Sequence, residues 1–108
     1  MEVHRELGFG FSEIVYKDAL EIEALSKGIP ISREKEFCVH YKNQKLHHHY
    51  FADFVMFDAI IVEIKACPGG IANEHIAQTI NYLKVSCCTV GLIINFGRKS
   101  LEHNRLVF

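Results

Sequence analysis

An apolar run from Tyr50 to Lys65 constrains this chain more than any other segment. Most of its residues suit a buried strand, yet it carries a carboxylate at Asp53 and then Glu63 and Lys65, two residues apart. Side chains two apart on a strand project from the same face, so Glu63 and Lys65 must lie together. Burying such charges among apolar neighbours is unfavourable unless they are paired or serve a function. The run therefore predicts a sheet whose interior holds a small charged site.

Composition places the chain among ordinary globular proteins. Its 108 residues are 49% hydrophobic and 23% charged, which suits one domain over residues 1–108. No apolar run approaches the roughly 20 residues that cross a bilayer, and the first residues lack the apolar stretch of a secretory signal. The formal net charge of −1 excludes a surface that is basic throughout. We expect a cytoplasmic protein without a membrane partner.

The cysteines and histidines offer weak evidence for a metal site. No C-x-x-C pair occurs, which argues against zinc and favours free, reduced thiols at Cys38, Cys67, Cys87 and Cys88. The tract His47-His48-His49 can be interpreted as a metal-binding tract or as a polar stretch of strand. Alternating side-chain directions separate its members and favour the polar strand.

Periodicity and breaker residues predict an α/β protein. The expected elements are a short helix ending at Leu7, a helix over residues 12–27, strands over 36–41, 46–57 and 60–66, a helix over 74–85, and strands over 89–96 and 101–108. Residues 42–45 form the expected hairpin turn between the first two strands. This order favours a mostly buried central sheet flanked by helices.

The register of the second and third strands decides whether the acids can meet. Asp53 opposes Glu63 only if Met56 opposes Ile60, which leaves a three-residue loop over residues 57–59. A two-residue turn at 58–59 would place the two carboxylates on opposite faces. The proposed site therefore requires the longer loop or a nearby bulge.

An Asp, a Glu and a Lys that converge can hold Mg²⁺ and perform phosphoryl chemistry. The ion prefers oxygen ligands, so Asp53, Glu63 and the backbone carbonyl of Ile64 are the candidate metal ligands. A bound ion would polarise a phosphodiester and activate water. Lys65 could orient or deprotonate that water, or neutralise charge developing on the phosphate. The alternative interpretation is an edge-strand salt bridge or a solvated face.

Both long helices carry further candidate residues. Glu13 on the first could add a ligand, directly or through water; its alternative role is to stabilise the helix N-terminus. His75, Gln78 and Tyr82 form one stripe on the other and could face the same site. Tyr82 could instead belong to the core.

Five segments together resemble the GxxExxY protein family, a compact branch of the PD-(D/E)XK nuclease superfamily. They are Gly10–Tyr16 with the naming motif, Ala52-Asp53, Ile61–Ala66, His75–Lys84 and Gly91–Gly97. The resemblance covers nearly the whole chain. It implies a restriction-endonuclease-like αβββαβ core, with a mixed central sheet flanked by helices.

The resemblance also implies roles for individual residues. Asp53, Glu63 and Lys65 would occupy the metal and catalytic positions, and Glu13 would be the acidic residue on the helix. Gln78 and Tyr82 match the Gln-x-x-x-Tyr pattern of exonuclease-like branches, which implies substrate binding.

These observations lead to three functional hypotheses. The first is a Mg²⁺- or Mn²⁺-dependent nuclease that hydrolyses DNA, and the second is a catalytically silent module for nucleic-acid binding or complex assembly. The third is a purely structural protein without divalent ions. Exposed basic residues could contact phosphates, namely Lys42, Lys45, Lys84, Arg98, Lys99 and Arg105. A groove for duplex DNA on so short a chain would require a homodimer or a partner protein.

Overall fold

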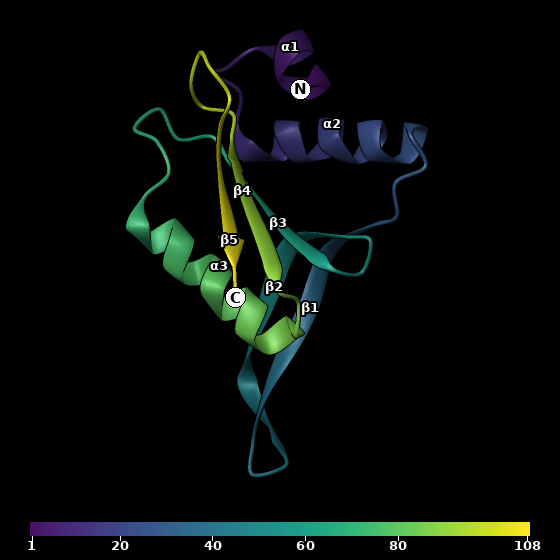
Figure 1. Cartoon of the computed structure of the whole chain (residues 1–108), viewed down its shortest axis with the longest axis vertical. Coiled ribbons are helices and arrows are strands. Elements are labelled where there is room, and N and C mark those ends of the chain that lie inside the picture. The colour runs from purple at the N-terminus through teal and green to yellow at the C-terminus, as the bar shows by residue number, and fades with distance from the viewer.

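A five-stranded sheet lies between helices in the computed structural model, which describes residues 1–108 (Figure 1). The elements in chain order are α1 (Glu2–Leu7), α2 (Glu13–Ser26), β1 (Ile31–Tyr41), β2 (Gln44–Met56), β3 (Ile60–Lys65), α3 (Asn73–Ser86), β4 (Val90–Asn95) and β5 (Glu102–Val107). No helix is both long enough and apolar enough to span a membrane.

The strands follow the order β1-β2-β3-β4-β5 across the sheet. Neighbours are antiparallel except β3 and β4, which are parallel and are joined by α3 as the crossover. Helices α1 and α2 cover one face and α3 covers the other (Figure 1). The predicted αβββαβ order with a mixed central sheet is confirmed.

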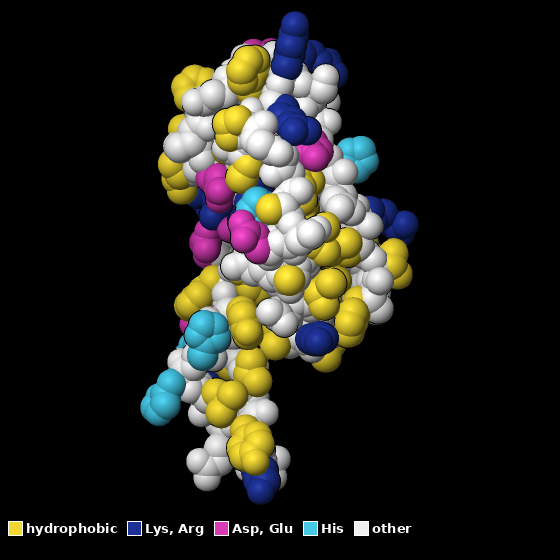
Figure 2. Space-filling model, turned by 90° about the vertical axis from the view of Figure 1, so that its left-hand side faces the viewer, with side chains coloured by type: hydrophobic (Ala, Val, Ile, Leu, Met, Phe, Trp, Pro, Cys, Tyr) yellow, Lys and Arg dark blue, Asp and Glu magenta, His cyan; other side chains and the backbone are white.

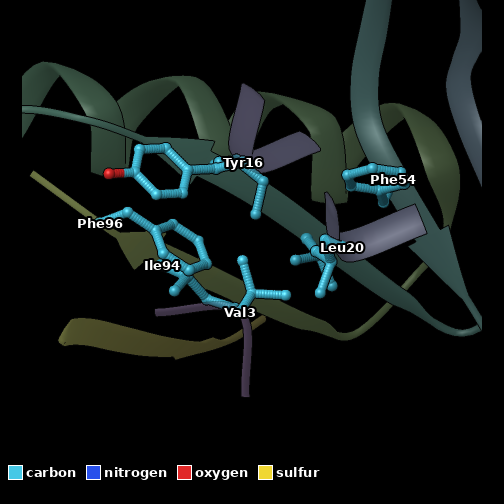
Figure 3. Packing of buried hydrophobic residues seen from close by; sticks show 8 residues of the cluster. Val3, Tyr16, Leu20, Phe54, Ile94 and Phe96 are labelled. Carbon is cyan, nitrogen blue, oxygen red and sulfur yellow. The ribbon is translucent and has the colours of Figure 1, made fainter. Parts of the chain in front are cut away.

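The face under α1 and α2 contains the larger apolar cluster. Its buried residues are Val3, Tyr16, Leu20, Phe54, Val62, Ile64, Ile94 and Phe96 (Figure 3). The ring of Tyr16 stacks on Phe96 with centroids 4.6 Å apart, and its hydroxyl donates to the carbonyl oxygen of Gly8 at 2.8 Å. Tyr16 therefore fixes the start of α2 and the turn before it on the sheet.

The opposite face is covered by α3. Tyr82 and Leu83 pack there against three buried strand residues, Ala52, Val55 and Ile61. Thr79, Tyr82 and Leu83 are the buried residues of this helix, whereas Ile76 and Ile80 are only half-buried.

The loop between β2 and β3 has the length that the predicted site requires. Met56 opposes Ile60 and Phe54 opposes Val62, so residues 57–59 form a three-residue connection. Phe57 and Asp58 both have positive φ angles, which reverse the chain tightly. This register places Asp53 and Glu63 at the same level of the sheet.

The hairpin of β1 and β2 extends beyond the body of the molecule (Figures 1 and 2). We call its outer part, residues 36–51, the arm. β1 begins at Ile31, five residues earlier than predicted, and the turn is the two-residue Lys42-Asn43 rather than residues 42–45. Both turn residues have positive φ angles, as in the tight hairpin turns that match strand twist. Histidine side chains stand along one side of the arm (Figure 2).

Candidate active site

The carboxyl groups of Asp53 and Glu63 each accept a hydrogen bond from the backbone of the neighbouring strand. The backbone N–H of Asp53 donates to Oε2 of Glu63 at 2.7 Å, and the backbone N–H of Ile64 donates to Oδ2 of Asp53 at 2.8 Å. The side chains thus satisfy backbone groups just beyond the last paired residues of the ladder between β2 and β3, Phe54 and Val62. Both acids are buried, with exposed fractions of 8% for Asp53 and 2% for Glu63.

Burial of two neighbouring carboxyls disfavours the charge on one of them. Desolvation, reinforced by the negative charge of Asp53, raises the pKa of Glu63 to about 8. The N–H bond from Asp53 and the positive charges of Lys65 and Lys17 oppose this increase without cancelling it. At neutral pH and without a cation, Glu63 therefore carries a proton most of the time.

One oxygen of Glu63 is available to a ligand. Oε2 accepts the hydrogen bond from Asp53, whereas Oε1 accepts none. No fully buried side-chain oxygen or nitrogen in the chain lacks a hydrogen-bond partner. Oε1 therefore faces space that water or an ion can enter, although the residue as a whole is buried.

Lys17 on α2 supplies the positive charge nearest to Asp53. Its Nζ lies 2.7 Å from Oδ1 of Asp53 and 3.0 Å from Oε1 of Glu34. Burial lowers the pKa of Lys17, but the two carboxylates outweigh burial and the pKa is raised overall. The sequence analysis missed Lys17 and Glu34. The available signal was the position of Lys17 one helical turn after Glu13, on the same side of α2.

Three acids lie in a row across β1, β2 and β3. Glu34 stands at the level of Asp53, between the paired residues Arg33/Phe54 and Lys35/Ala52, and Glu63 continues the row on β3. Strand alternation is broken there: Ala52 and Val55 pack in one cluster although they are three apart, and Glu34 has a φ of 53°. This irregularity explains how Asp53 can contact α2 while staying bonded to β3.

Lys65 lies two residues after Glu63 on the same strand and is half-buried. Its charge lowers the pKa of Glu63, which places its ammonium group near that carboxyl. It follows the alternation of β3, so it projects from the same face as Glu63.

The loop after Lys65 is held by Asn95, which is fully buried. Its Oδ1 accepts the N–H groups of Cys67 and Gly97, and its Nδ2 donates to the carbonyl oxygen of Cys67 at 2.8 Å. A Cβ atom on Gly97 would lie 2.4 Å from the backbone nitrogen of Cys67. The chain leaving the site is therefore fixed by a side-chain clamp and a close backbone approach.

The other predicted site residues make no direct contact with the carboxyl groups of Asp53 and Glu63. Glu13, the first residue of α2, is half-buried and makes no hydrogen bond or ion pair with Asp53 or Glu63; Lys17 of the same helix pairs with Asp53 instead. His75 accepts the N–H of Ala72 through Nδ1 and so caps α3. Gln78 is exposed on α3. Burial raises the pKa of Tyr82, and the nearby charges of the acid row raise it further.

The sequence model of the PD-(D/E)XK nuclease superfamily matches residues 1–106. The chain belongs to this superfamily. The crystal structure of SSO0001 has a similar fold, with a TM-score of 0.67 and 16% sequence identity. The match covers 86% of this chain and 48% of that one, so the chain spans about half the length of SSO0001. At this identity the likeness shows the fold alone. No curated protein matches the sequence.

Nucleases of the PD-(D/E)XK superfamily typically use divalent metal ions. The donor set fits such an ion. The two carboxyl groups come from adjacent strands, and each has one oxygen that accepts no backbone hydrogen bond. These oxygens are Oδ1 of Asp53 and Oε1 of Glu63. Lys17 already places a positive charge at the first of these oxygens. A cation there would therefore compete with Lys17 and replace the proton of Glu63.

Proposed function

We propose that the chain is a Mg²⁺- or Mn²⁺-dependent nuclease that hydrolyses phosphodiester bonds of DNA. The observation that carries this proposal is the buried pair of Asp53 and Glu63, held in fixed orientation by backbone N–H groups, with Lys65 beside it. We also assign the chain to the GxxExxY family, because the motif residues Gly10, Glu13 and Tyr16 are present. Its four free cysteines suit a place in the cytoplasm.

Each residue of the centre has a proposed role. Asp53 and Glu63 would hold the ion through the oxygens that accept no backbone hydrogen bond, with Lys17 displaced from Oδ1 of Asp53, and the backbone carbonyl of Ile64 would be the third protein ligand. A bound divalent ion supplies Lewis-acid stabilisation of the phosphate and lowers the pKa of water. Lys65 orients the attacking water or neutralises charge on the phosphate in the transition state.

The helices supply the proposed contacts at the edge of the centre. Glu13 acts through an ordered water or a rearranged side chain, since Lys17 rather than Glu13 contacts Asp53 in the structure. Gln78 and Tyr82 are one turn apart on α3, so they share a side of that helix. Gln78 is exposed and able to contact substrate, whereas Tyr82 supports the acid row from within the core.

A cleavage assay tests this proposal. Labelled single- and double-stranded DNA and RNA oligonucleotides are incubated with the protein in Mg²⁺ or Mn²⁺, and wild type is compared with Glu63→Gln. The variant keeps the acceptor for the Asp53 N–H but cannot carry the charge, so cleavage should fall about 100- to 1,000-fold. Glu74→Gln, the same change at an exposed acid of α3, is the matched control. Equal cleavage by wild type and Glu63→Gln overturns the assignment.

The ion pair between Lys17 and Asp53 favours a second candidate, a catalytically silent module that binds nucleic acid or assembles a complex. Lys17 neutralises the carboxylate oxygen that a metal would need. Calorimetry with Mn²⁺ on wild type and Lys17→Met separates the candidates. A nuclease should bind Mn²⁺ in its wild-type form and cleave, whereas metal uptake without turnover on any nucleic acid supports the silent module.

The exposed basic residues determine how the chain could bind duplex DNA. The basic side chains named as phosphate contacts are all exposed. They lie on the arm, on α3 and around β5, so one chain offers separated contacts rather than a continuous basic groove. We therefore propose that duplex DNA is engaged by a homodimer or with a partner protein. The oligomeric state on DNA, measured by light scattering, tests this.

A further inference from the structure

Three potential metal ligands of different chemistry meet on the arm. Cys38 of β1 is directly opposite His49 of β2, and Glu36 lies two residues before Cys38 on the same face. The thiol of Cys38 donates to Oε1 of Glu36 at 3.5 Å, and Nδ1 of His49 lies 3.1 Å from the same oxygen. The three ligand atoms all lie within 4.8 Å of one another.

These distances match those between ligands of one zinc ion. With Zn–S of about 2.3 Å and Zn–N or Zn–O of about 2.0–2.1 Å, tetrahedral sulfur and oxygen ligands lie about 3.5 Å apart. Nitrogen and oxygen ligands then lie about 3.3 Å apart. Thiolate and imidazole are ligand types that favour zinc over magnesium, and zinc also accepts a carboxylate oxygen. We propose that Glu36, Cys38 and His49 bind a zinc-like divalent transition metal.

This site differs from the acid row in chemistry and in position. Asp53 and Glu63 offer only oxygen, whereas the arm site offers sulfur, nitrogen and oxygen. Phe37 and Tyr50 pack on the cluster under α3, so their strand neighbours Glu36, Cys38 and His49 project from the opposite face. The proposal goes beyond the nuclease function and does not depend on it.

The metal would link the two strands at the base of the exposed hairpin. The pairing of β1 and β2 shifts between Cys38 and His40, immediately outward of the three ligands. A bound ion would hold the strands together at the last residues before this irregularity. Three protein ligands leave a fourth position, and the exposure of Glu36 opens it to water or to an external ligand. The thiol releases its proton to the buffer on binding.

Titration of the reduced, metal-free full chain with Co²⁺ tests the proposal. Cobalt substitutes for zinc, and a thiolate ligand gives a sulfur-to-cobalt charge-transfer absorption in the near ultraviolet. We expect this band to saturate at one Co²⁺ per chain and to disappear on addition of Zn²⁺. Cys38→Ser should abolish the band, and His49→Ala or Glu36→Gln should weaken Co²⁺ binding at least about tenfold.

Three matched controls keep the test specific. Cys88→Ser, a change at another half-buried thiol, should leave the band unchanged. His48→Ala removes a neighbouring histidine whose ring packs on Tyr50, and should also have no effect. Asp53→Asn should retain the band while altering Mn²⁺ binding. Absence of a band, its persistence in Cys38→Ser, or equal weakening by His48→Ala and His49→Ala overturns the proposal.

Discussion

Strand β2 passes through two very different environments. Near the acid row it is covered by α2 on one face and by α3 on the other. A few residues away, in the arm, the same strand is largely open to solvent. The change occurs over three residues of β2, because Phe54 is 0% exposed and Phe51 is 48% exposed.

This contrast shows that the surrounding layers determine the chemistry of a strand residue. Glu63 has a raised pKa because two layers of side chains remove it from water. The arm keeps its polar groups accessible, so they can take ligands from solvent without that penalty. The two proposed metal sites follow this contrast: a desolvated centre that would take hard cations and an open site that would take softer ones.

The largest expected difference between the buried part of the sheet and the arm is in the stability lost when a phenylalanine ring is removed. Phe54→Ala would leave a cavity under α2 and should lower the free energy of unfolding by about 3–5 kcal/mol. Phe51→Ala removes the same ring three residues away on the arm and should change it by less than about 1 kcal/mol. Urea unfolding measures both. Equal losses would contradict the division between body and arm.

The next effect concerns two lysines, one in each environment. Lys65→Ala should lower kcat about 100- to 1,000-fold if its charge has the proposed role at the reacting phosphate. Lys45→Ala on the arm should instead raise KM and reduce the salt dependence of DNA binding, as expected for one phosphate contact. Steady-state kinetics at two salt concentrations separates these outcomes. A similar decrease of kcat in both variants would contradict the different roles proposed for the two lysines.

A smaller effect should appear as pH dependence of stability. The pKa of Glu63 is about 8 in the folded chain and near 4.5 when the chain is unfolded, so folding favours the protonated form. This stabilisation is complete below pH 4.5 and is lost as pH rises toward 8, by roughly 1–3 kcal/mol.

Glu63→Gln cannot titrate, so its stability should vary less over this pH range than that of wild type. Urea unfolding in chelator at pH 5, 7 and 9 measures both proteins, and Glu74→Gln, with its exposed carboxyl, is the control. Parallel curves for wild type and Glu63→Gln would falsify the raised pKa.

The smallest effect lies at the tip of the arm. Lys42 adopts a φ of 49°, a conformation that asparagine tolerates better than lysine. Lys42→Asn should therefore raise the free energy of unfolding by about 0.5 kcal/mol. Thermal unfolding of the variant checks this. A decrease would show that the Lys42 side chain, whose Nζ lies 5.5 Å from the ring centroid of Tyr41, contributes more than backbone strain removes.

Much of the fold could be predicted because it depends on local patterns. Strand periodicity and turn residues gave the order of elements, whereas the sequence left two registers open for β2 and β3. The structure has the register with the three-residue loop, which aligns Asp53 with Glu63. The residue roles remain predictions until activity and metal binding are measured.

The rest required tertiary contacts that no single segment reveals. β1 begins within a polar stretch because Arg33 pairs with Asp18 and Glu21 of α2, which lets charged residues enter the sheet. Lys17 of α2 pairs with Glu34 of β1, where a positive φ angle breaks the strand alternation. A periodic sequence pattern cannot predict such a break.

The proposed ligands on the arm come from two strands, so no short sequence motif contains all three of them. The absence of a C-x-x-C pair therefore neither supports nor opposes this proposal. Cross-strand pairing of Cys38 with His49 was needed to bring thiol and imidazole together.

The clamp formed by Asn95 and Gly97 has a practical consequence for protein engineering. Because Cys67 is anchored through both its N–H and its carbonyl, the segment at Pro68-Gly69 begins from a fixed point. Recognition loops of other lengths could be grafted there without displacing the lysine upstream. The exit of β3 is thus a natural insertion point for redirecting the specificity of this small scaffold.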